Sequence, residues 1–77
     1  METMDMMPWL KEELADSIKY ATAARHEHGV MRQMLHDMAE EEREHACAVW
    51  HMMEMEGQTK GLDKHTVFHD ADAALYK

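Results

Sequence analysis

The chain has 77 residues, and its sixteen acidic and eight basic side chains give a formal net charge of −8. A chain this short makes one domain, residues 1–77, and rarely buries enough apolar surface to be stable without a metal ion or a partner chain. The negative charge argues against nucleic acid or an anionic membrane as a partner and favours cations. No apolar run approaches the roughly 18 residues of a membrane span, and the single Cys47 excludes an intrachain disulfide, so we expect a cytoplasmic protein.

The first predicted element is a helix over about 8–27, because Pro8 suits a first helical turn. Apolar or small residues then recur at spacings of three and four, as in an amphipathic helix, at Leu10, Leu14, Ser17, Ile18, Ala21 and Ala24. Glu13 and Tyr20 fall within this stripe.

A turn is expected around His26 to Gly29, followed by a second helix over about 30–56. Its stripe has core spacing and consists of Met31, Met34, Leu35, Met38, Ala46, Val49, Trp50, Met52 and Met53. Glu42 and His45 interrupt the stripe on its own face.

Gly57 and Gly61 bracket a hinge, and Asp63 is a suitable N-cap for a third element over 62–77. This element is expected to be a short helix packed on the ends of the other two, or a tail. No segment alternates apolar and polar residues over the length of a strand, so the fold class is all-α, an antiparallel two-helix hairpin with a short C-terminal helix.

The run Glu42-x-x-His45 places a carboxylate and an imidazole on nearly the same face of a helix. Glu13 precedes the expected turn by as many residues as Glu42 follows it. In an antiparallel hairpin the two acids would therefore lie level, and the sequence predicts a metal site from Glu13, Glu42 and His45.

One hairpin satisfies only part of its apolar stripes, whereas two hairpins paired as an antiparallel four-helix bundle bury both. Two copies would bring together four carboxylates and two imidazoles, which match two divalent cations. We therefore expect a homodimer or higher homo-oligomer, with the metal site on its two-fold axis.

Glu13 followed by Tyr20, and Glu42-x-x-His45-Ala46 in an acidic helix rich in Met and Ala, resemble the half-repeat of ferritin-like di-iron carboxylate proteins. The resemblance covers about residues 9–56 and is greatest to the short encapsulated ferritins. It implies a ferroxidase that oxidises Fe(II) with dioxygen or peroxide, with Glu13, Glu42 and His45 as iron ligands and manganese or zinc as substitute metals. Tyr20 would lie beside the site as a hydrogen-bond donor or electron donor. An encapsulin shell is a partner implied by the family, although no recognisable encapsulin-targeting extension follows the third element.

Other interpretations remain open. The acidic run 40–44 is also typical of a solvated helix face, and Glu12 rivals Glu13 as a ligand. Two other functions are a metal-binding or metal-buffering module without turnover and a metal-free dimerisation hairpin. The ten methionines and the additional histidines also suggest copper(I), although methionine at core spacing commonly fills gaps between helices.

Overall fold

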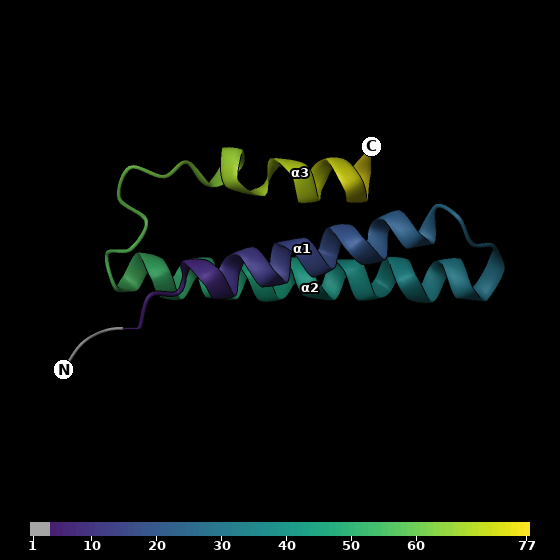
Figure 1. The fold of residues 1–77 in the computed structure, drawn as a ribbon, viewed down its shortest axis with the longest axis horizontal. Helices are drawn as coiled ribbons and strands as arrows, with labels where there is room; N and C mark the ends of the chain where they lie inside the picture. Colours follow the sequence, from purple (N-terminus) through teal and green to yellow (C-terminus); the bar gives the residue numbers. More distant parts are fainter. Residues whose placement is uncertain (1–3) are drawn as a thin grey trace.

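A computed structural model describes residues 4–77, so the first three residues of the predicted domain lie outside the described part. The described chain folds into three helices without any strand, α1 (Met7–Ala24), α2 (Gly29–Met55) and α3 (Lys64–Tyr76). Helices α1 and α2 form an antiparallel hairpin, and α3 runs back along it toward the end where α1 turns into α2 (Figure 1). The all-α hairpin with a short third helix is confirmed. None of these three helices is both long and apolar enough to cross a bilayer.

The hairpin turn is set by local backbone geometry. Pro8 lies in the first turn of α1, as predicted, but α1 ends at Ala24, three residues before the predicted end. The backbone N–H groups of Arg25, His26 and Glu27 each donate to the carbonyl three residues earlier, at 3.1 to 3.2 Å, so the chain tightens and leaves the α-helix. Gly29 then begins α2 with φ +60°, a left-handed conformation that favours glycine.

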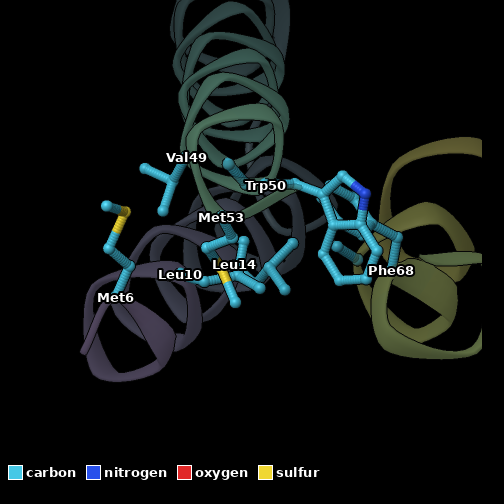
Figure 2. Close-up of a cluster of buried hydrophobic side chains, with 9 residues drawn as sticks. Met6, Leu10, Leu14, Val49, Trp50, Met53 and Phe68 are labelled. Carbon is cyan, nitrogen blue, oxygen red and sulfur yellow. The ribbon is translucent and has the colours of Figure 1, made fainter. Parts of the chain in front are cut away.

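The core is a cluster at the open end of the hairpin, where all three helices contribute side chains (Figure 2). Leu10 from α1, Met53 from α2 and Phe68 from α3 are all at most 1% exposed. The Trp50 and Phe68 rings meet edge to face, 6.1 Å between centroids, an arrangement that aromatic pairs prefer. Helix α3 therefore packs along the hairpin and not on its ends, because Phe68, Ala71 and Leu75 present a continuous apolar edge.

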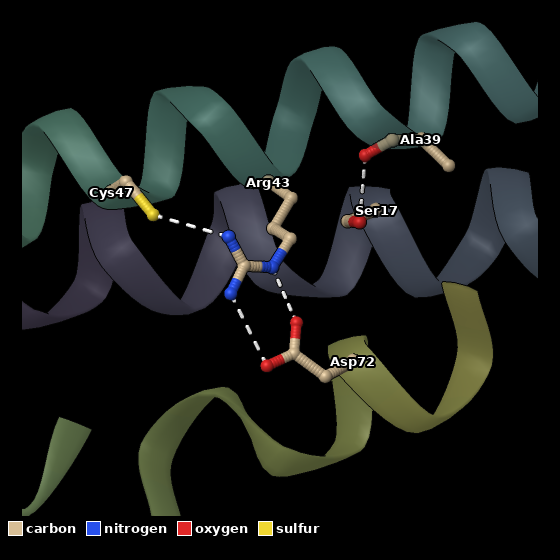
Figure 3. A network of polar contacts seen from close by, with 5 residues as sticks. All are labelled: Ser17, Ala39, Arg43, Cys47 and Asp72. Carbon is tan, nitrogen blue, oxygen red and sulfur yellow. Dashed lines mark hydrogen bonds and ion pairs between the residues drawn. The ribbon is translucent and has the colours of Figure 1, made fainter. Parts of the chain in front are cut away.

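Polar contacts fix the three helices in register (Figure 3). The Ser17 hydroxyl, which is fully buried, donates a 2.8 Å hydrogen bond to the Ala39 carbonyl across the hairpin. Arg43 on α2 holds Asp72 on α3 with both Nε and Nη2, and its guanidinium carbon lies 5.4 Å from the centre of the Phe68 ring. Asp63 caps α3 by accepting from the Thr66 backbone N–H, as predicted.

The prediction that the methionines in the first half of α2 are core residues is wrong for the single chain. Met31, Met34 and Met38 are 55%, 56% and 40% exposed. Helix α3 covers a different side of the hairpin, so this part of the stripe has no covering element among residues 4–77. Met53 and Trp50, further along α2, are buried as expected.

Candidate metal centre

The hairpin brings Glu13 of α1 level with Glu42 and His45 of α2. One ligand atom from each of these three side chains lies within 4.8 Å of the others. The geometry follows from the chain itself, because antiparallel helices place residues equally far from their turn side by side. The three residues that the sequence predicted as metal ligands are therefore neighbours in the structure.

The distances within this cluster suit shared coordination better than direct hydrogen bonding. His45 Nδ1 lies 3.6 Å from Glu13 Oε2 and 3.5 Å from Glu42 Oε1. These separations exceed the usual N–H···O range of up to about 3.2 Å. Two ligands that each bind one ion at about 2.1 Å are about 3.0 to 3.4 Å apart at ordinary coordination angles. A small contraction of the cluster would bring all three atoms to such an ion.

Glu13 is the most enclosed member of the cluster, with a side chain that is 18% exposed. Its Oε1 accepts a 3.2 Å hydrogen bond from the Trp9 indole Nε1–H, one helical turn earlier. Its Oε2 is buried and has no hydrogen-bond partner within the described chain. A buried carboxylate oxygen without a donor is costly, and a cation would remove that cost.

Glu42 lies beside a second acid, Glu13. Its pKa is raised above the ordinary value, first because the facing Glu13 carboxylate favours the protonated form of Glu42. Partial burial and repulsion from the Glu13 charge add to the rise, whereas the nearby His45 opposes it. Glu42 therefore gives up its proton less readily than a free glutamate, as expected where two carboxylates face each other.

Tyr20, predicted to lie beside the site, packs elsewhere. Its ring lies against the second apolar cluster, formed by Ala21, Ala39 and Leu75, and Lys19 Nζ lies 5.8 Å from the ring centre. Within residues 4–77 no hydrogen bond joins Tyr20 to the three candidate ligands. Glu12, the rival ligand, is exposed and does not belong to the cluster.

Sequence reasoning missed two features of this region. The first is Trp9 as a donor to Glu13, which the spacing of four residues on one helix signals. The second is a group formed by His36, Asp37 and Glu40 on α2 alone. Its polar atoms are largely satisfied, because His36 Nδ1 pairs with Glu40 at 3.1 Å and Gln33 donates to Asp37 at 2.8 Å. This second group offers no orphaned ligand atom and fits a metal less well.

Comparisons with protein-family models, with curated proteins and with solved structures found no match.

Proposed function

We propose that this chain is a ferroxidase-type protein that binds iron through Glu13, Glu42 and His45 and oxidises Fe(II) at a di-iron site completed by a second copy. The observation that carries the proposal is the buried, partnerless Oε2 of Glu13, which faces an imidazole nitrogen and lies beside a second carboxylate. Carboxylate oxygens with one imidazole suit iron or manganese better than ions that prefer thiolates.

The chemistry of the donor set supports a shared site. One copy offers two carboxylates and one imidazole, which are too few to fill the coordination of two ions. A second copy related by a two-fold axis would double the set and provide four negative charges for two divalent cations.

The surface around the cluster supports the same pairing. Met31, Met34 and Met38 continue at spacings of three and four residues to Glu42 and His45, so they belong to one face of α2. They are exposed, and Trp9, which contacts Glu13, is also 40% exposed. Exposed apolar side chains on the same face as a half-complete polar site are expected where a second hairpin docks.

Each residue then has a defined role. Glu13 and Glu42 would bind and bridge the ions, His45 would be a terminal ligand, and the Trp9 indole would orient the Glu13 carboxylate. Iron supplies the redox chemistry, since each Fe(II) gives up one electron to the oxidant. The chain gathers the donors and shields the Oε2 atom of Glu13 from water.

The test is oxidation of Fe(II). Anaerobic protein is loaded with Fe(II) and exposed to air, while ferric absorbance and oxygen consumption are followed. The expected rate exceeds that of protein-free buffer, and Glu42→Ala removes the excess while the exposed neighbour Glu41→Ala keeps it. Binding of Fe(II) without excess oxygen consumption would instead indicate a metal buffer. Assembly that is unchanged by chelation, with no metal binding, would indicate a metal-free dimerisation hairpin.

A further inference from the structure

A polar hollow lies at the turn end of the hairpin, where α1 and α3 end and α2 begins. Its volume is about 280 Å³, and its basic lining residues are Arg25, Arg32, His36 and Lys77. Ala21 and Leu75, both buried, form part of its wall.

The charge of this hollow is opposite to that of the whole chain. Three of the eight lysines and arginines line it, whereas none of its lining side chains is acidic in a chain with sixteen acidic side chains. Among the described residues, Arg25, Arg32 and Lys77 form no ion pair with a carboxylate. Within residues 4–77, the one acid that a lining side chain engages is Glu40, which pairs with His36.

Arg25 is held in place by the end of α3. Its Nη2 donates to the carbonyl oxygens of Ala74 at 2.8 Å and Ala73 at 3.3 Å. These bonds offset the negative end of the α3 dipole and leave Nε and Nη1 of the same guanidinium without a hydrogen-bond partner in residues 4–77. Arg32 and His36 are four residues apart on α2, so they lie on one face of that helix.

We propose that this hollow binds a phosphate group. A fixed guanidinium with free N–H donors suits an oxyanion, which accepts charge-assisted hydrogen bonds from arginine. Arg32 supplies further positive charge, and a doubly charged phosphate gains more from two guanidinium groups than a monovalent anion does. This proposal does not depend on the metal centre, since none of its residues belongs to the Glu13, Glu42 and His45 cluster.

The test titrates inorganic phosphate into the metal-free protein, kept with a chelator, and follows binding by calorimetry and by ³¹P line width. We expect saturable binding that Arg32→Glu weakens by about tenfold or more, because it replaces a donor with a repelling charge. Lys60→Glu makes the same charge change at an exposed position outside the hollow and should alter affinity by less than about twofold. Circular dichroism checks that both variants keep their helices.

Two results would overturn the proposal: no saturable binding of phosphate, or equal weakening by both variants, which would indicate a general charge effect. A parallel titration with glycerol 3-phosphate distinguishes the source of the group. Similar affinity supports recognition of a phosphate carried by a larger molecule, and weaker affinity supports free phosphate.

Discussion

Replacing Glu42 with glutamine removes one of two facing carboxylates and keeps the size of the side chain. The Glu13 and Glu42 ligand oxygens lie within 4.8 Å of each other. Two unit charges at that distance repel by about 0.9 kcal/mol at the dielectric constant of bulk water and by about 3.5 kcal/mol at an effective value of 20. Proton uptake by Glu42 relieves part of this repulsion. We therefore expect Glu42→Gln to stabilise the metal-free protein by about 1 to 2 kcal/mol at pH 7, or roughly 5 to 15 °C in Tm.

The pH dependence of this gain has a definite sign. Because the pKa of Glu42 is raised in the folded chain, the folded state binds more protons than the unfolded state just above the ordinary glutamate value of about 4.3. Wild-type stability should therefore fall as the pH rises through this window. The extra stability of the Glu42→Gln variant over the wild type should be complete at pH 7 and absent below about pH 4.

The assay is urea unfolding at a fixed protein concentration, first with a chelator and then with excess manganese. A ligand at about 100 times its Kd raises the free energy of unfolding by about 2.7 kcal/mol. Manganese should therefore stabilise the wild type by about this amount and the Glu42→Gln variant by far less. Glu41→Gln, the same change at an exposed neighbour, is the matched control. If Glu42→Gln were no more stable than Glu41→Gln without metal, the two carboxylates do not face each other and the reasoning fails.

Three further changes test other contacts. Trp9→Phe removes the donor to Glu13 and should weaken manganese binding by about tenfold in calorimetry, an effect typical of groups that orient a ligand; unchanged affinity would contradict the role of the indole. Asp72→Asn should cost about 1 kcal/mol at pH 7, because it breaks the partly buried pair with Arg43. Because Arg43 holds the pKa of Asp72 low, this loss of stability should persist above about pH 4 and disappear as the pH falls through the lowered pKa. Urea unfolding at a series of acidic pH values measures it. If the stability difference between wild type and Asp72→Asn did not narrow in acid, the ion pair would not be its cause. Met34→Glu should shift the proposed dimer toward monomers in analytical ultracentrifugation, while Met55→Glu, at the other end of α2, should not; equal effects would place the interface elsewhere.

The helices were predictable because their signals are local. Pro8 in the first turn of α1, Gly29 at the start of α2 and Asp63 before α3 act through their own backbone geometry, whatever packs around them. The meeting of Glu13 with Glu42 and His45 was predictable for a related reason. In an antiparallel hairpin, equal distance from the turn along the chain becomes proximity in space.

Only the tertiary structure decided which apolar surfaces are covered and which polar groups meet. Periodicity marks the apolar face of a helix but does not say what packs on it, so α3 along the hairpin and the exposed Met31, Met34 and Met38 were not foreseen. The pairing of Arg43 with Asp72, and the gathering of Arg25, Arg32 and Lys77 in one hollow, join residues from different helices. Their spacing in the sequence carries no periodic signal, because the approach of α3 to the hairpin is set by side-chain packing in three dimensions.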